Sequence, residues 1–273
     1  MTHAGVQYIH GYHERESDRL RAQAWSVEDH LHLDTRYASG SLVLEAGCGT
    51  GAQTVTLARN NPRTRIVAVD RSRVSLDEAR ARVEGAKLSN VEFHQADLFD
   101  LPFAYRSFDH VFLCFVLEHL PNPRHALARL RKLLKSGGTL TTFEGDHGSV
   151  LFHPESDSAR RAVACQVELQ RRSGGDANIG RRLYPLLRAA GYIDVRVTPC
   201  PVYVDGSRPK LIDAFTRQTF TGMVADVRER AIAAAMIDSD DFDRGVRDLD
   251  RVASDGVFCY TFFKGKAVCP RGR

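Results

Sequence analysis

Three glycines stand at alternate positions, Gly47, Gly49 and Gly51, directly after the apolar run of residues 42–46. Glycine loses more backbone freedom on folding than any other residue, so this cluster marks a turn with unusual backbone angles or a close approach to a ligand. A strand, a glycine loop and a helix form a cofactor cradle, because the helix N-terminus adds free N–H donors and positive potential. Residues 47–52 also fit the dinucleotide pattern G-x-G-x-x-G/A, so the loop alone does not identify the cofactor.

Acidic residues lie beside the loop and at the ends of the apolar runs that follow it. Glu45 precedes the glycines, Asp70 ends the next run, and Asp97 with Leu98 ends the third. An acid about 20 residues after such a loop can accept hydrogen bonds from ribose hydroxyls. Ligands of open α/β sheets bind outside the carboxyl ends of the strands, so we expect these groups and the segment "LCFVLEHL" to meet at one edge of a sheet.

The apolar pattern predicts the elements that must position these groups. Short apolar runs alternate with amphipathic segments five times, which is typical of a parallel sheet with helices on both faces. A capping box of Ser75 and Glu78 begins the second helix, and a glycine closes the third. The expected strands are residues 42–46, 65–70, 91–97, 108–116 and 139–145, and the expected helices are residues 52–60, 75–88 and 123–138.

After residue 145 the alternation stops. We expect helices at 156–172 and 179–190, a strand within 192–204, further helices within 208–253, and a last strand at 257–268. A helix at 13–34 precedes the sheet. The predicted organisation is an N-terminal helical cap at 1–40 and a domain at 41–273, in which residues 145–192 and 208–254 are helical elaborations on the substrate side.

Five stretches together resemble a known family: "LEAGCGTG", "VAVD", "QADLFDLPF", "SFDHVFLCFVLEHL" and "LRKLLKSGGTL". They look like the successive motifs of class I S-adenosylmethionine-dependent methyltransferases, in the small-molecule group that includes ubiquinone/menaquinone-type C-methyltransferases. The resemblance covers roughly residues 40–145, and its motifs are specific as a set. It implies a Rossmann-like fold with a mostly parallel seven-stranded sheet, an antiparallel last strand, an N-terminal helical cap and a helical insertion before that strand.

The resemblance also implies S-adenosyl-L-methionine as the cofactor and assigns residues to it. Those expected at the methionine part are Gly47, Gly49, Gly51, Glu45 and Phe115, with Tyr12 of the first helix capping the carboxylate. Asp70 is expected at the ribose, because one carboxylate suits two vicinal hydroxyl donors. Arg71, Asp97 and Leu98 are expected at the adenine. Each residue has a structural alternative, as part of a turn, a strand-end cap, the core or a solvated surface.

The implied reaction is displacement at a methyl group on a sulfonium. The leaving thioether is neutral and needs no acid, so alignment is the main requirement, and orientation is worth about 7–11 kcal/mol of barrier. A base would add about 10²–10⁴-fold if the acceptor carries a proton. Histidine is the preferred shuttle because it titrates near neutrality. The candidates for the base are Glu144, Asp146, His147 and His153 at or after the end of the fifth strand and His119 after the fourth. His147 is preferred among them, although most of the 11 histidines serve other purposes.

Three residues are candidates for binding the methyl acceptor. Arg182 and Tyr184, in the stretch "GRRLYPLLRAAGY", could face an acidic group, and Asp146 follows the fifth strand. The alternative for the first two is an amphipathic helix with solvated arginines. We expect no metal site, because the spacing of His147, His153 and Asp146 matches no strong ligand pattern.

Within the family that the chain resembles, the charge and the motifs favour a small-molecule methyl acceptor over a nucleic acid. The formal net charge of +4 on 273 residues is nearly balanced, and no Asn/Asp-Pro-Pro-aromatic motif is present, so no nucleic acid is expected. No apolar stretch reaches the roughly 18–20 residues of a membrane span, and the N-terminus is polar. Six cysteines without a CxxC pair indicate buried thiols in a reducing compartment. We therefore expect a cytoplasmic enzyme of small-molecule biosynthesis without a membrane partner. The sequence leaves open whether the enzyme forms a homo-oligomer.

Two other functions compete with methyl transfer. An NAD(P)-dependent Rossmann oxidoreductase is disfavoured, because it has no use for Asp97 or the "LEHL" segment and no Tyr-x-x-x-Lys is present. A non-catalytic S-adenosylmethionine-binding protein is disfavoured by the intact glycine loop and Asp70. The residues leave open whether the acceptor atom is N, O, C or S.

Overall fold

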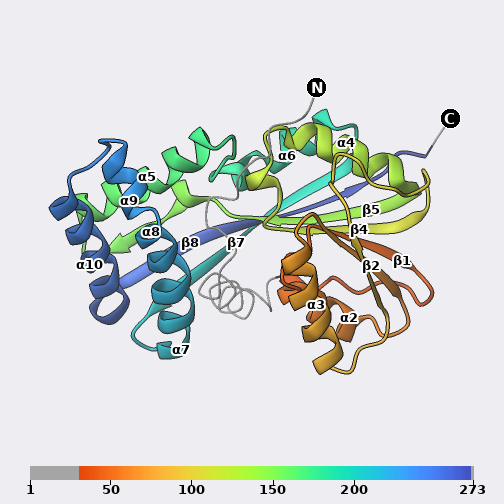
Figure 1. Cartoon of the computed structure of the whole chain (residues 1–273), viewed down its shortest axis with the longest axis horizontal. Helices are drawn as coiled ribbons and strands as arrows, with labels where there is room; N and C mark the ends of the chain where they lie inside the picture. Colours follow the sequence, from red (N-terminus) through yellow and green to blue (C-terminus); the bar gives the residue numbers. More distant parts are fainter. Residues whose placement is uncertain (1–30, 272–273) are drawn as a thin grey trace. The chain divides into compact units, whose positions relative to one another are not determined.

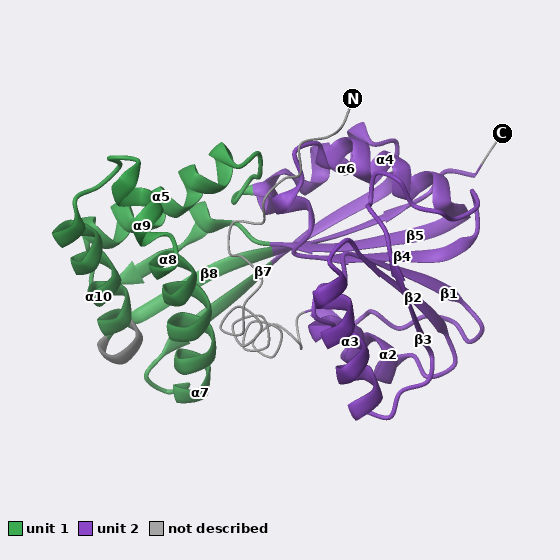
Figure 2. Cartoon of the chain, viewed as in Figure 1, with its two compact units in different colours: residues 1–27, 145–178, 200–262 green, residues 28–144, 179–199, 263–273 purple. Residues whose placement is uncertain are grey.

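The computed structural model describes residues 31–271, apart from the side chains of residues 253–255. The chain forms two compact units, which are coloured separately in Figure 2. Of the described residues, unit 1 holds 145–178 and 200–262, and unit 2 holds 31–144, 179–199 and 263–271. Within the described residues, no helix combines the length and apolar character that a membrane span needs. All six cysteines are free thiols.

Unit 2 contains the alternating strands and helices that the sequence predicts. Its strands are β1 (Leu42–Ala46), β2 (Arg65–Asp70), β3 (Val91–Gln95), β4 (Phe108–Cys114) and β5 (Leu134–Glu144). They lie in the order β3-β2-β1-β4-β5 and all pair in parallel. The last strand, β8 (Val257–Val268), pairs antiparallel with β5. The parallel sheet and the antiparallel last strand are therefore confirmed.

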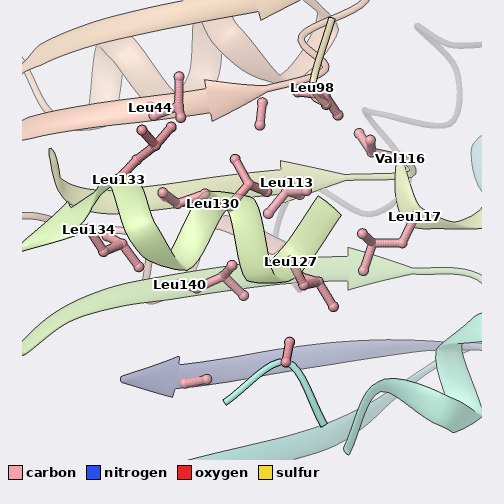
Figure 3. Packing of buried hydrophobic residues seen from close by; sticks show 14 of the residues in the cluster. Leu44, Leu98, Leu113, Val116, Leu117, Leu127, Leu130, Leu133, Leu134 and Leu140 are labelled. Carbon is pink, nitrogen blue, oxygen red and sulfur yellow. The ribbon is translucent and has the colours of Figure 1, made fainter. Parts of the chain in front are cut away.

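Helices cover both faces of this sheet (Figure 1). On one face lie α2 (Ala52–Asn60) and α3 (Arg73–Gly85), and on the other lie α4 (Pro123–Leu133) and α6 (Leu183–Ala189). Short 3-10 turns follow β4 at Leu117–His119 and precede α6 at Ile179–Arg182. Figure 3 shows the leucine-rich layer between α4 and the sheet, to which Leu113, Leu130 and Leu140 contribute fully buried side chains.

Several predicted boundaries in unit 2 are wrong; a local cap explains one of them, and pairing between distant segments explains another. The helix predicted from Ser75 begins at Arg73, because Ser72 is the N-cap and its hydroxyl accepts a hydrogen bond from the Ser75 N–H. The helix predicted to reach residue 138 ends at Leu133, and β5 begins at once. There Gly137 and Gly138 form backbone hydrogen bonds with Cys269. These residues therefore belong to the sheet, although the two glycines in the sequence indicate the end of a helix.

Unit 1 is mostly helical. Its helices are α5 (Asp157–Arg172), α7 (Pro209–Leu211), a π-helix (Ile212–Thr221), α8 (Gly222–Ala225), α9 (Arg228–Ala233) and α10 (Ser239–Asp255). The predicted helices at 156–172 and within 208–253 fall in this unit. Helix α10 is held to α5 by the ion pair of Arg161 with Asp241.

Among residues 31–271 the sheet has eight strands, whereas the sequence predicts seven. The additional strand is β6 (Leu151–His153), which pairs antiparallel with the first residues of β8 inside unit 1. It has only three residues, too few for a period-two pattern to stand out from its polar flanks. Strand β7 (Ile193–Asp205) matches the strand predicted within 192–204, and it pairs with β8.

Candidate cofactor site in unit 2

The glycine loop joins β1 to α2, and its three glycines have different tasks. All have positive φ, with values of 80° at Gly47, 52° at Gly49 and 77° at Gly51. A Cβ on Gly47 would lie 2.6 Å from the Val116 side chain, and one on Gly51 would lie 2.9 Å from Ala79. A Cβ on Gly49 would meet nothing within 4 Å. The outer glycines therefore fit against their own chain, whereas Gly49 leaves the main chain open to a ligand.

Asp70 ends β2 beside this loop. One carboxylate oxygen accepts the Gly49 N–H at 2.9 Å, and the other accepts the Ser72 N–H at 2.9 Å. The side chain is half-buried, and each oxygen retains a second lone pair. Asp70 thus shapes the glycine loop and the start of α3, and it keeps the capacity to accept two hydroxyl donors.

Glu45 ends β1 beneath the loop. Its side chain is 3% exposed, and its Oε2 has no hydrogen-bond partner among the described residues. Burial raises the pKa of Glu45 to about 8 against the opposing effect of the Thr54 hydroxyl, and the Asp70 charge adds to the rise. Buried polar atoms are normally paired, so this oxygen keeps an unused capacity to accept or share a hydrogen bond.

The ends of β2 and β3 carry the residues expected at the adenine. Asp97 is exposed, and its Oδ1 accepts the Phe99 N–H at 2.8 Å. Leu98 is buried at 9% exposure and belongs to the leucine-rich layer. Arg71 is exposed, and its carbonyl accepts the Gln95 side-chain amide at 3.0 Å. The structure brings these residues to the same edge as Asp70, and their contacts to a cofactor stay predictions.

The turn after β4 borders the glycine loop. Phe115 has a φ of 56°, a left-handed conformation that is uncommon for a bulky residue, and its N–H donates to the Phe143 carbonyl at 2.9 Å. The next N–H groups point to one buried carboxylate, that of Glu144 at the end of β5. Val116 donates at 3.3 Å, Leu117 at 3.0 Å and Glu118 at 3.3 Å. Burial and the Glu118 charge raise the pKa of Glu144, whereas these N–H bonds oppose the rise.

Three further candidates lie in unit 2 with exposed or partly buried side chains. His119 is partly buried, and its Nε2 lies 3.4 Å from the Glu118 carboxylate. Arg182 and Tyr184 are exposed, at the junction between the 3-10 turn and α6. Nothing in their packing conflicts with a role toward an acceptor, and that role stays a prediction.

The other catalytic candidates belong to unit 1. His147 is buried, with its Nδ1 3.0 Å from both the Ala177 carbonyl and the Tyr260 hydroxyl, and its Nε2 3.1 Å from the Met223 sulfur. A carbonyl only accepts, so Nδ1 carries a proton. His153 is exposed at the end of β6, and Asp146 is buried with its carbonyl accepting from Ser149. Their catalytic and substrate roles stay predictions, and Tyr12 lies outside the described residues.

Sequence reasoning did not find the roles of two residues that shape the site. Glu144 is predicted only as a candidate base and has no place in the predicted cofactor set, although an acidic residue at the end of an apolar strand is a visible signal. Val116 reads as one more core residue, and only the fold shows its methyl groups against Gly47.

Comparison with known proteins identifies the central part of the chain. Residues 43–138 match the family model for a methyltransferase domain. The uncharacterized 37.1 kDa protein in transposon TN4556 of Streptomyces fradiae is 31% identical over 208 residues, which cover 75% of this chain and 56% of that protein. A demethylmenaquinone methyltransferase of Bacillus cereus is 28% identical over 155 residues, which cover 53% of this chain and 65% of that enzyme. The aligned segments thus leave more than a third of each relative unmatched.

A solved structure extends the match to nearly the whole chain. The (4+2)-cyclase SpnF aligns with a TM-score of 0.54 at 20% identity, over 97% of this chain and 86% of that one. At this identity the match concerns the fold alone. The shared fold therefore includes the elements beyond residue 138, whereas it does not identify a reaction.

Proposed function

The chain belongs to the class I S-adenosylmethionine-dependent methyltransferases, and from this premise we propose that it transfers a methyl group from S-adenosylmethionine to a small-molecule acceptor. One observation carries the proposal most directly. The main chain at Gly49 is open, and the Asp70 carboxylate that fixes it stands at the end of the neighbouring strand. The open backbone lets a ligand approach closely, and the carboxylate keeps lone pairs for its hydroxyl donors, at the carboxyl ends of the strands where open sheets bind ligands.

The residues of unit 2 would divide the work of binding. Asp70 would accept the two ribose hydroxyls, and Gly49 would let the methionine part lie against the backbone. Glu45 would meet the polar methionine end through its unpaired oxygen. Asp97 would accept a hydrogen bond from the adenine amino group, and Leu98 would supply a backbone N–H to the ring. When bound, S-adenosylmethionine supplies an electrophilic methyl group on a positively charged sulfur.

Transfer then depends on alignment of the acceptor with that methyl group. Orientation of this kind is worth about 7–11 kcal/mol of barrier. For an acceptor that carries a proton, we propose His147 as the base, with His153 and His119 as the other candidates. Arg182, Tyr184 and Asp146 are the proposed acceptor contacts. A small-molecule acceptor is supported by the demethylmenaquinone methyltransferase among the relatives and by the balanced charge of the chain.

Calorimetric titration tests the cofactor. S-adenosylmethionine and S-adenosylhomocysteine should bind in the micromolar range, and NAD should not. Tighter binding of NAD would support the oxidoreductase alternative and overturn the proposal.

An acceptor screen tests the activity. Release of S-adenosylhomocysteine is measured against panels of phenols, quinols, amines, thiols and carboxylic acids. Cofactor binding without turnover of any compound class would favour a non-catalytic binding protein.

Once an acceptor is known, single-turnover kinetics test the base. His147→Ala should lower the transfer rate about 100-fold while S-adenosylmethionine affinity is unchanged, because the interaction is made only in the transition state. His153→Ala is measured in parallel because His153 is another candidate base, and a loss confined to that variant would assign the role to His153. Wild-type rates in both variants would leave alignment alone as the source of catalysis.

A further inference from the structure

We propose that Glu144 is a positioning residue for the cofactor site: its carboxylate fixes the turn after β4, and this turn fixes the glycine loop through Val116. The inference rests on the proposed function, since it concerns the loop that would hold S-adenosylmethionine. It assigns no contact between Glu144 and the cofactor.

Glu144 holds the turn after β4 through hydrogen bonds to its backbone. The side chain is fully buried at the end of β5. Its Oε1 accepts the N–H groups of Val116 at 3.3 Å and Leu117 at 3.0 Å, and its Oε2 accepts the N–H of Glu118 at 3.3 Å. The Thr142 hydroxyl donates to Oε1 at 3.2 Å. Three successive backbone donors therefore converge on one side chain of the neighbouring strand.

The turn after β4 contains an unfavourable backbone conformation, which the hydrogen bonds of Glu144 can stabilise. The sheet pairing of β4 with β5 ends at Phe115, whose N–H donates to the Phe143 carbonyl. Phe115 then takes a positive φ of 56°, which a bulky side chain disfavours. Strained backbone persists only where the surrounding structure determines it, and here the contacts of Glu144 begin at the very next residue.

The turn is also linked to the glycine loop. The Val116 side chain lies against Gly47, so closely that a Cβ on that glycine would come within 2.6 Å of a methyl group. Val116 is 9% exposed, and Figure 3 shows it with Leu117 just beyond the end of β4. Gly47 in turn donates its N–H to the Val69 carbonyl at 2.8 Å, next to Asp70. A shift of the turn would therefore reach the loop by direct packing.

The chemistry of the side chain suits this role. A carboxyl group has two oxygens with lone pairs, so it can accept N–H donors on both. A glutamine at this place would keep one acceptor oxygen and turn a donor toward the remaining N–H. An alanine would leave all three donors without an acceptor, which is costly in a buried site.

Titration with S-adenosylhomocysteine, followed by calorimetry, tests the proposal on folded variants of the full chain. Glu144→Ala should weaken affinity about tenfold or more, and Glu144→Gln should fall between it and the wild type because it retains one acceptor. Val116→Ala should weaken affinity several-fold. In the double variant Glu144→Ala/Val116→Ala the two losses should not add, because both act through one contact.

The matched control is Asp109→Ala. Asp109 lies at the opposite end of β4 and accepts the Leu42 N–H at 2.9 Å, so its loss weakens the same sheet without touching the turn. We expect wild-type affinity in this variant at a comparable loss of thermal stability. A purely structural role of Glu144 would instead weaken binding in both variants in proportion to lost stability, and would overturn the proposal.

Wild-type affinity in Glu144→Gln and Val116→Ala would also overturn it. If the Glu144 variants do not fold, Val116→Ala decides alone, since normal binding there breaks the link from turn to loop. Absence of binding by the wild-type protein would overturn the proposed function and this inference together. Normal binding by all variants would overturn the inference only.

Discussion

Glu45 and Glu144 are buried glutamates at the ends of two strands of one sheet, yet their surroundings are opposite. Burial raises the pKa of both. The Glu144 carboxylate accepts three backbone N–H groups, whereas Oε2 of Glu45 has no partner among the described residues. An acidic residue at the end of a buried strand can therefore stabilise its own chain or be available to a ligand. The two cases differ in whether its oxygens already accept hydrogen bonds from the chain.

The same contrast appears within the glycine loop, and the largest expected effect tests it. Gly49→Val should abolish S-adenosylmethionine binding while the protein still folds, because the branched side chain would fill the open space beside the loop and resist the positive φ. Calorimetry measures the affinity, and circular dichroism checks the fold.

Gly47→Val is the matched variant. Its side chain would collide with Val116, so it should lower the melting temperature as well as the affinity. Normal binding by Gly49→Val would show that the loop does not face the cofactor.

Asp70 combines the two roles, because it accepts hydrogen bonds from its own chain and keeps lone pairs for a ligand. Asp70→Ala should weaken S-adenosylmethionine affinity about 100-fold or more, because two charge-assisted hydrogen bonds of roughly 1.5–3 kcal/mol each would be lost. Titration with adenosine and with methionine locates the loss. An affinity within about threefold of the wild type would contradict the ribose assignment.

Glu144 should stabilise the folded protein through the three backbone N–H groups that it accepts. Glu144→Ala should lower the free energy of unfolding by about 3 kcal/mol, because three buried N–H groups lose their acceptor. Urea denaturation followed by fluorescence or circular dichroism measures the change. Thr142→Val, which removes only one hydroxyl donor from the same carboxylate, is the control and should cost about 1 kcal/mol. Equal losses in the two variants would contradict the role given to the backbone contacts.

The smallest expected effect is a pH dependence of the free energy of unfolding that arises from Glu45. The folded protein holds a proton on Glu45 up to about pH 8, whereas the unfolded chain releases it near its ordinary value of 4.5. The stability of the wild type should therefore fall as pH rises through that window, since the unfolded state binds fewer protons. Glu45→Gln removes this contribution, so between pH 5 and 7 it should gain about 2 kcal/mol relative to the wild type.

Denaturation at several pH values measures the difference between the two proteins. Glu144 is present in both, so its own titration cancels. Glu84→Gln, at an exposed position, is the control and should follow the wild type. A constant difference for Glu45→Gln across the window would mean that Glu45 is already ionised in the folded protein.

The sequence by itself determined the parallel sheet, the order of its motifs and the residues at its carboxyl edge. Strands β1, β2 and β8 have the predicted bounds, because buried runs of five or more apolar or alternating residues leave little choice of period. The acidic residues Glu45 and Asp70 follow from their places at strand ends. These are local signals, and they need no knowledge of what packs against them.

Only the tertiary structure decided what each of these residues touches. The start of β5 depends on pairing with Cys269, which is more than 130 residues away in the chain, and β6 exists only through its pairing with β8. The different tasks of Gly47 and Gly49, the contact of Val116 with the loop and the three donors around Glu144 likewise arise between distant segments. Each of these hydrogen bonds and packing contacts joins two residues that are distant in the sequence. A local sequence pattern contains only one of the two, so it cannot identify the contact.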